Sequence, residues 1–296
     1  MQYDAIVVGG SYAGLAAALQ LARARRKVLV VDGGQRRNRF AVHSHGFLTQ
    51  DGMEAAEIAA IGKAQLLAYD NVDWLDGVVA SAERSETGFR LQVEGGPTRE
   101  AKRLVLAVGA TDHLPDLPGL AERWGRHVFH CPYCHGYELN QEAIGVLATS
   151  PMSTHLALML PDWGPTTFFL NGAFTPDSDQ LQQLQARGVN VEPGLIARIE
   201  GTLDLVMQDG RVMKPAGLFV AMRIETNGSI AHQLGCAMDE GPFGRTIKID
   251  GMKATTVPGV FACGDAARPG GSVAIAVGDG TIAGSATHRS LIFGLG

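Results

Sequence analysis

The sequence predicts an α/β protein in which one domain is split along the chain and a second domain is inserted into it. Three observations support this fold class. A strand, a glycine-rich turn and a helix open the chain, and a second alternation of strands and helices fills its middle. A strand with the sequence GVFACGD then returns near the end, before a long helix. Alternating strands and helices are typical of parallel sheets with helices packed on their faces.

The first α/β unit begins with an apolar strand over residues 3–8 (YDAIVV). The turn GGSYAG (residues 9–14) follows, then a helix, then a second strand over residues 27–31 that leads into Asp32. In such a unit the helix N-terminus binds a pyrophosphate, and an acidic residue about 20 residues after the glycines binds a ribose hydroxyl. The pattern therefore predicts a dinucleotide site, with a tight turn in some other α/β protein as the alternative.

The remaining elements follow from the same hydrophobic patterns. Helices are expected at residues 51–69, 153–160, 178–186 and from Ser272 onward. Strands are expected at residues 78–82, 89–93, 103–108, 142–148, 166–170, 189–191, 195–199, 203–207, 218–221 and 246–250. Two stretches rich in proline or glycine, residues 113–119 and 239–245, predict linkers. We therefore expect one domain of residues 1–114 with 245–296, and an inserted domain of residues 115–244.

Length and composition are ordinary for a soluble globular enzyme. The chain has 296 residues, of which 46% are hydrophobic and 19% charged, and this length allows two domains with apolar cores. The net charge of −5 argues against nucleic acid as the main partner. The N-terminus has no signal-peptide pattern and no apolar run approaches the ~18 residues that would span a bilayer, so we expect a cytoplasmic protein with no membrane partner.

The stretch CPYCHGYE (residues 131–138) carries the chemistry. Cys131 and Cys134 can close a small disulfide ring and exchange two electrons, and their thiolates are reactive nucleophiles. In a cytoplasmic protein such a pair indicates redox or catalytic use rather than a structural disulfide. A zinc site is the alternative. It is disfavoured because no second cysteine pair exists, and because His130 and His135 abut the cysteines and cannot easily complete a tetrahedron.

Four features occur together and in a specific order: the GGSYAG turn, LAVGA (residues 106–110), the CxxC pair, and VPGVFACGDAA (residues 257–267) before the last helix. With them the chain resembles the thioredoxin reductase-like family of FAD disulfide oxidoreductases over nearly its whole length. The resemblance implies two Rossmann-like three-layer (ββα) domains, with FAD on the discontinuous domain and the CxxC pair on the inserted one. It also implies a homodimer.

The resemblance further implies roles for single residues. Cys134 would face the flavin, Cys131 would exchange with the substrate, and His135 stands where thioredoxin reductases typically have Asp. A CxxC followed by His is similar to the dithiol oxidase branch, including the gliotoxin and holomycin oxidases, and a histidine there can act as a base near neutral pH. The implied FAD-binding residues are Gly9, Gly10, Ser11, Ala13, Gly14, Asp32, Gly33, His45, Thr49, Val79, Gly109, Gly264, Asp265, Ser272, Val273 and Ala274.

The inserted domain departs from the thioredoxin reductase pattern where NADPH should bind. The turn after its first strand reads ATSPMS (residues 148–153), without glycine, and residues 127–186 hold no Lys or Arg for a phosphate. NADPH is therefore doubtful. We expect a dithiol, either a small molecule or a thioredoxin-like protein, to supply electrons that pass through FAD to oxygen. The alternatives are a thioredoxin reductase fed by NADPH or by a protein donor, and a flavin-linked redox sensor without turnover.

Overall fold

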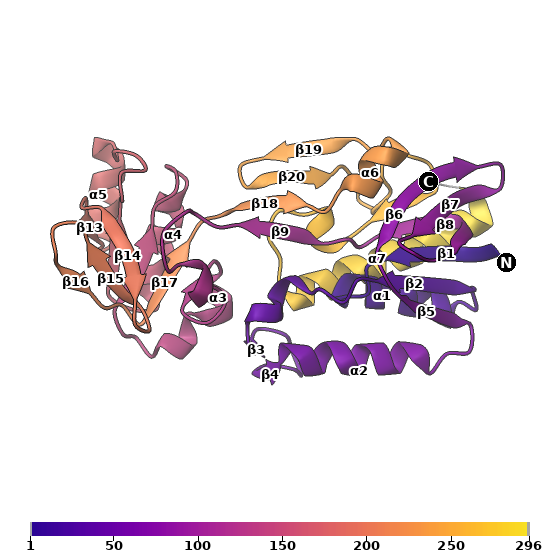
Figure 1. The fold of residues 1–296 in the computed structure, drawn as a ribbon, viewed down its shortest axis with the longest axis horizontal. Coiled ribbons are helices and arrows are strands. Elements are labelled where there is room, and N and C mark those ends of the chain that lie inside the picture. Colours follow the sequence, from indigo (N-terminus) through magenta and orange to yellow (C-terminus); the bar gives the residue numbers. More distant parts are fainter. Residues whose placement is uncertain (1, 295–296) are drawn as a thin grey trace. The chain divides into compact units, whose positions relative to one another are not determined.

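The computed structural model describes residues 2–294 and divides them into two compact units (Figure 1). Unit 1 holds the chain up to Arg39, residues 47–111 and the chain from Ile224 onward, whereas unit 2 holds residues 40–46 and 112–223. The expected boundary at residue 114 lies close to residue 112, where the longer part of unit 2 begins. The expected return at residue 245 lies well after Ile224, where the chain re-enters unit 1.

Unit 1 is built on a seven-stranded sheet of order β5-β2-β1-β8-β7-β6, in which β21 also pairs with β8. The strands β5, β2, β1, β8 and β21 are parallel, and β7 and β6 extend the sheet antiparallel. Their bounds are β1 Gln2–Val8, β2 Val28–Asp32, β5 Val72–Asp76, β6 Val79–Ser85, β7 Gly88–Val93, β8 Thr98–Leu106 and β21 Val260–Ala262. The central strands β1 and β2 read as apolar runs because both of their faces are covered.

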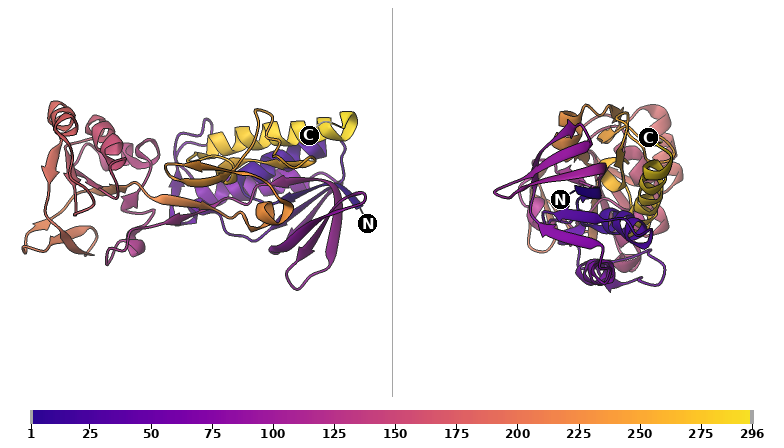
Figure 2. Two further views of the ribbon diagram at one scale, coloured as in Figure 1. Left: turned by 90° about the horizontal axis from the view of Figure 1, so that it is seen from above. Right: turned by 90° about the vertical axis from the view of Figure 1, so that its right-hand side faces the viewer.

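One face of this sheet is covered by helices α1 (Tyr12–Arg23) and α7 (Val273–Phe293), and α2 (Ala55–Leu67) packs beside α1 (Figures 1 and 2). The two covering helices touch through their backbones. A Cβ added to Gly280 would lie 2.0 Å from the carbonyl oxygen of Ala13. On the other face, side chains of β1, β2 and β8 form one apolar core with side chains of β6 and β7 and of helix α6 (Ser229–Leu234). The glycine-rich turn before α1 and the start of α7 thus belong to one helical layer.

The second expected linker, residues 239–245, is wrong, because this stretch is a β-hairpin of unit 1. Strands β19 (Met238–Gly241) and β20 (Gly244–Ile247) pair antiparallel, with Asp239 opposite Thr246. The proline and glycines therefore mark a hairpin turn, not a flexible connection. Apart from the two ends of residues 40–46, the chain passes between the units at β9 (Ala110–His113) and β18 (Arg223–Thr226), which are neighbours in a sheet of order β19-β20-β18-β9. Two short strands complete the list, β3 (His43–Ser44) in unit 2 and β4 (Met53–Glu54) in unit 1.

Unit 2 repeats the three-layer plan. Its parallel sheet has the order β10-β17-β11-β12-β13, and β14, β15 and β16 form an antiparallel sheet. Their bounds are β10 Val128–Phe129, β11 Ile144–Leu147, β12 Thr166–Phe169, β13 Asn190–Glu192, β14 Ile196–Glu200, β15 Asp204–Met207, β16 Val212–Met213 and β17 Gly217–Val220. The helices are α3 (Pro132–His135), α4 (Ser153–Met159) and α5 (Ser178–Ala186).

Alternate side chains on the unit 2 strands enter two separate cores. On β12, Phe168 packs with α4 and α5, while the adjacent Phe169 packs with β14 and β15. This alternation follows from the two-residue period of a strand, so one parallel sheet is covered by helices on one face and by β-strands on the other. The predicted two-domain ββα architecture is confirmed.

Candidate functional site

The turn after β1 is shaped so that only glycine fits at two of its positions. Gly9 has φ +99°, and a Cβ there would lie 2.2 Å from the carbonyl oxygen of Ala107. A Cβ on Gly14 would lie 1.8 Å from the carbonyl oxygen of Gly9. The first turn of α1 is therefore packed directly onto the loop that precedes it, as in turns that let a pyrophosphate approach a helix N-terminus.

Asp32 ends β2 beside this turn, as predicted, and holds it. The amide of Gly10 donates a hydrogen bond to Oδ1 of Asp32 at 2.9 Å. Ser11 is the N-cap residue of α1, but its side chain makes no cap hydrogen bond. The second carboxylate oxygen of Asp32 and the hydroxyl of Ser11 are the polar groups that this turn can offer to a ligand.

A second predicted stretch of unit 1 also lies against α1. Gly264 has φ +67°, and a Cβ there would meet the Cβ of Ala13 at 2.8 Å. The neighbouring Asp265 pairs with Arg37, with 3.0 Å between Oδ2 and Nη1, and both side chains are largely buried. Sequence reasoning missed Arg37. The signal available was a run of cationic residues soon after the end of β2, at positions 36, 37 and 39.

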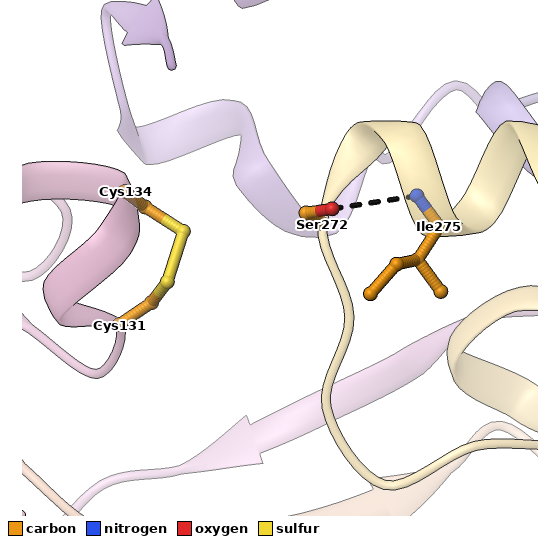
Figure 3. The surroundings of a disulfide bond; sticks show 4 residues. All are labelled: Cys131, Cys134, Ser272 and Ile275. Carbon is orange, nitrogen blue, oxygen red and sulfur yellow. Dashed lines mark hydrogen bonds between the residues drawn. A yellow bond between two sulfur atoms is a disulfide. The ribbon is translucent and has the colours of Figure 1, made fainter. Parts of the chain in front are cut away.

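The start of α7 is the third predicted part of the site. Ser272 is its N-cap, and Oγ of Ser272 accepts a hydrogen bond from the amide of Ile275 at 3.3 Å (Figure 3). The following Val273 is buried and Ala274 is half-buried. A helix of 21 residues places a partial positive charge at this end. Such an end suits the electron-rich edge of a reduced flavin.

Several buried polar atoms of unit 1 have no hydrogen-bond partner, and three of them belong to residues between positions 36 and 50, after the end of β2. Nε of Arg36, Oδ1 of Asn38 and Oε1 of Gln50 have no hydrogen-bond partner. Buried polar atoms are rarely left unsatisfied, so these atoms are suited to bind ligand groups. Together with the glycine turn and Asp32, they fit a dinucleotide such as FAD.

The structure places the other predicted residues less evenly. Thr49, Val79, Gly33 and Gly109 lie in unit 1, where Val79 is buried at the start of β6 and Thr49 has φ +72°. His45 lies instead with unit 2, the unit that carries the cysteine pair. The structure therefore groups His45 with the CxxC motif rather than with the dinucleotide turn.

Cys131 and Cys134 form a disulfide on one short helical turn (Figure 3). Cys131 is the N-cap of α3, Pro132 is its first residue, and the two Cα atoms are 5.3 Å apart. Both cysteines are half-buried, so the pair is accessible to a substrate. The sulfur atoms are bonded to each other, and the described residues contain no group of three His, Cys, Asp or Glu side chains that could hold a metal.

His135 follows the second cysteine and is held by an aromatic stack. Its ring lies 4.4 Å from that of Phe129 on β10, with 20° between the planes. Burial, with a smaller contribution from His45, lowers the pKa of His135 to about 4. The ring is therefore neutral at pH 7, with an unprotonated nitrogen that can accept a proton.

Two exposed tyrosines lie close to the disulfide in the sequence, Tyr133 on α3 and Tyr137 on the 3₁₀ turn that follows it. Tyr133 is 73% exposed and meets Trp163 edge to face, with 5.4 Å between the centroids. Tyr137 is 85% exposed. One polar contact lies here as well, because Nδ1 of His45 is 3.4 Å from Oε1 of Glu138.

The nucleotide turn of unit 2 is closed by its own side chains. The amide of Thr149 donates to Oγ of Ser153 at 3.0 Å, and the Thr149 hydroxyl donates to the carbonyl of Ala221 at 2.6 Å. At the end of β12, Oδ1 of Asn171 accepts a hydrogen bond from the amide of Ile196. The amide and hydroxyl of Thr149 are therefore engaged within the protein, whereas Oγ1 of Thr154, in the first turn of α4, is buried without a hydrogen-bond partner.

The remaining cysteines, Cys236 and Cys263, are packed in the core. Cys263 is 1% exposed and Cys236 is 5% exposed. Burial raises the pKa of Cys263 to about 12, and it also raises the pKa of Cys236. Both thiols are uncharged at neutral pH and are poor nucleophiles.

Comparisons with known proteins agree with this arrangement. The chain is 30% identical over 304 residues to thioredoxin reductase tcpT of Claviceps purpurea, covering 98% of this chain and 94% of the relative. It is 32% identical over 310 residues to thioredoxin reductase sirT of Leptosphaeria maculans, with coverage of 97% and 93%. A solved oxidoreductase from Agrobacterium tumefaciens is 56% identical with a TM-score of 0.97, covering 99% of both chains. The structure of HlmI is 35% identical with a TM-score of 0.90, covering 98% and 92%.

Within residues 2–294, no helix combines the length and the apolar character needed to cross a bilayer.

A comparison with protein families identifies the family of the chain. The family of pyridine nucleotide-disulphide oxidoreductases matches residues 3–280. The predicted resemblance is therefore confirmed, and the chain belongs to the pyridine nucleotide-disulphide oxidoreductase family.

Proposed function

We propose that this protein is an FAD-dependent oxidase that converts a dithiol to a disulfide through the Cys131–Cys134 pair and passes the electrons to oxygen. The observation that carries the proposal is the contrast between a reactive disulfide beside a neutral histidine and a closed nucleotide turn in the same unit. The first supplies thiol chemistry, and the second argues against NADPH as the electron donor.

The chain's own residues carry out two thiol–disulfide exchanges. One substrate thiolate attacks Cys131, the bond between Cys131 and Cys134 breaks, and Cys134 leaves as a thiolate. The second substrate thiolate then attacks the substrate sulfur of the mixed disulfide, which releases the product disulfide and leaves both cysteines reduced. Two electrons have then moved from the dithiol to the cysteine pair. Each exchange requires a thiolate.

His135 is the base in this scheme. It is neutral at pH 7, so it can take a proton from an incoming thiol. The pKa of about 4 belongs to the form with the disulfide closed. Once Cys134 becomes a thiolate, its negative charge favours the imidazolium and raises the pKa of His135. His135 therefore binds the proton most tightly when Cys134 is a thiolate, and the resulting imidazolium stabilises that negative charge.

The unit 1 site would hold FAD at the turn of Gly9 and Gly14, at Asp32 and at Asp265, with the start of α7 near the flavin. FAD, when bound, supplies a two-electron acceptor that oxygen can reoxidise. The residues of this site bind and orient the cofactor. A homodimer, a cytoplasmic location and a dithiol substrate, either a small molecule or a thioredoxin-like protein, stay predictions.

The alternative is a reductase that takes electrons from NADPH, and the names of the relatives tcpT and sirT favour it. A sensor without turnover is less well supported, because the disulfide is accessible and paired with a base. The test is to follow the flavin spectrum of the purified protein without oxygen, adding NADPH, NADH and dithiothreitol separately, and then to admit air. Bleaching by dithiothreitol with recovery in air is expected, whereas rapid bleaching by micromolar NADPH would overturn the oxidase.

A further inference from the structure

The glycine turn of unit 1 lies against a tryptophan that belongs to none of the motifs predicted for FAD. A Cβ on Gly10 would lie 2.3 Å from Cη2 and 2.8 Å from Cζ2 of Trp74. It would also lie 2.8 Å from the Cβ of Asp32. The indole of Trp74 therefore fills the space beside Gly10 in which a side chain would stand, and the stem of Asp32 borders the same space.

The register of the sheet places Trp74 beside the end of β2. Strand β5 pairs in parallel with β2, so that Trp74 stands opposite Val30. Two residues further along β5, Asp76 stands opposite Asp32. Residues two apart on a strand point to the same face of the sheet. The side chains of Trp74 and Asp76 therefore lie on one face, next to the strand that ends in Asp32.

Two charged side chains hold the indole in place. Its Nε1 donates a hydrogen bond to Oδ1 of Asp76 at 2.8 Å. The ammonium of Lys63, on α2, lies 4.0 Å from the ring centroid, where the π electrons attract a cation. Nζ of Lys63 is also 3.6 Å from Oδ1 of Asp76. One edge and one face of the indole are thus engaged, while two atoms of its six-membered ring lie against the turn.

This arrangement bears on ligand binding because Gly10 and Asp32 are joined. The amide of Gly10 donates to Oδ1 of Asp32 at 2.9 Å, which leaves Oδ2 for a ligand. An acidic residue at the end of the second strand of such a unit binds a ribose hydroxyl. Without the indole a space opens beside both residues, and the turn is free to shift relative to the carboxylate.

We propose that Trp74, held by Asp76 and Lys63, is a positioning residue for the adenosine end of the dinucleotide. It keeps the glycine turn against Asp32, so that one carboxylate oxygen stays on the Gly10 amide and the other is available to the ribose. The inference rests on the FAD site proposed for unit 1. It makes Trp74 a determinant of how well this site distinguishes dinucleotides by their ribose.

The test measures that discrimination. Full-length holoprotein is equilibrated with equal concentrations of FAD and an FAD analogue whose adenosine lacks both ribose hydroxyls, and the two bound flavins are separated by chromatography. The wild type should prefer FAD by about tenfold or more, the worth of a hydrogen bond to a charged group. Asp32→Ala should abolish the preference. Trp74→Ala should lower it most of the way to the Asp32→Ala value, a loss of about fivefold or more.

Lys63→Met is a milder and independent form of the test. It removes the cation from the ring and keeps a side chain of similar length at a partly exposed position. The preference should fall by about twofold, within the worth of an exposed cation–π contact. Lys102→Met is the matched control. Lys102 also pairs with an aspartate, but that residue, Asp4, lies near the start of β1, whereas the glycine turn follows its end. Its preference should equal that of the wild type.

The preference is a ratio, so it separates positioning from stability. A purely structural loss in Trp74→Ala would weaken both flavins equally and leave the ratio at the wild-type value, and this result would overturn the inference. If Trp74→Ala does not fold, an unchanged ratio in Lys63→Met would overturn it. A wild type that purifies without flavin would refute the proposed function as well. The competition involves no electron transfer, so reduction by NADPH, which would overturn the oxidase alone, leaves its result as it stands.

Discussion

Both units of this chain contain a turn between a parallel strand and a helix, but the two turns differ in their glycines and in their hydrogen bonds. In unit 1, the turn between β1 and α1 has glycines that no other residue can replace, and Asp32 binds its Gly10 amide. In unit 2, the turn between β11 and α4 has no glycine, and Ser153 occupies the amide of Thr149. One turn is shaped for a ligand and the other is satisfied from within.

The difference shows how one fold supports two kinds of chemistry. A parallel sheet with helices presents a helix N-terminus after its first strand, and a phosphate can use it only if the backbone is accessible. Unit 1 keeps that access. Unit 2 keeps the sheet and its two cores, but its reactive groups lie on the short helix α3 that carries Cys134 and His135. Function thus resides in the site rather than in the fold.

The largest expected effect comes from filling the unit 1 turn. Gly14→Ala places a Cβ against the carbonyl oxygen of Gly9, a contact that backbone must move to relieve. We expect the purified variant to lose essentially all bound FAD, measured as the ratio of flavin to protein absorbance. Gly278→Ala is the matched control, because Gly278 is exposed on α7 and a Cβ there meets nothing within 4 Å. A Gly14→Ala protein with a full complement of FAD would contradict the comparison.

The next effect tests the chemistry assigned to unit 2. Removing a general base typically slows a reaction by about 10²-fold or more, so His135→Gln should slow flavin reduction by dithiothreitol by about that factor. The measurement is stopped-flow absorbance without oxygen at pH 7. Bound FAD should be unchanged, since His135 lies in unit 2 and the dinucleotide turn lies in unit 1. A wild-type rate in this variant would remove His135 as the base.

Some features of both units could be predicted from the sequence because their cause is local. The glycines of the first turn, the acid that ends β2 and the spacing of the cysteines are each set by neighbours in the chain. Helix α5 has the predicted bounds, and its start is fixed by a capping box between Asp177 and Gln180. Such local signals do not depend on contacts with distant parts of the chain.

Other features depend on contacts between distant residues, and the sequence did not predict them. The hairpin of β19 and β20 looked like a linker because Pro242 and the glycines around it fit either structure. The pair of Arg37 with Asp265 and the contact of His45 with Glu138 join residues far apart in the chain. No local sequence pattern predicts these two contacts. The strand β5 and the short helix α6 were missed, since five and six residues give little periodicity to read.

A smaller effect concerns stability and the cost of keeping His135 neutral. Its pKa is about 4 in the folded protein, below the ordinary value of 6.5. Between these values the unfolded chain binds a proton that the folded one does not, so the free energy of unfolding falls as pH falls from 6.5 toward 4. The full pKa difference would correspond to a fall of ~3 kcal/mol. His135→Gln should remove less than this amount, because the ring is partly exposed. Urea unfolding at several pH values measures it.

Only the pH-dependent difference between the two proteins counts in that experiment, because Gln also loses the stack on Phe129 at every pH. A His43→Gln variant serves as the control, and its free energy of unfolding should fall with pH as that of the wild type does. Parallel curves for wild type and His135→Gln would show that His135 has an ordinary pKa, and the lowered pKa assigned to this ring in unit 2 would then be wrong.

The smallest expected effect comes from opening the unit 2 turn. Ser153→Ala removes the hydroxyl that accepts from Thr149, and loss of one such hydrogen bond should lower the free energy of unfolding by about 1 kcal/mol. The freed amide restores one donor, but residues 127–186 still offer no cation to a phosphate. NADPH should therefore still fail to bleach the flavin without oxygen. If this single change made NADPH an efficient donor, the Ser153 hydroxyl alone would separate the two turns, and unit 2 would be a blocked nucleotide site rather than one rebuilt for thiol chemistry.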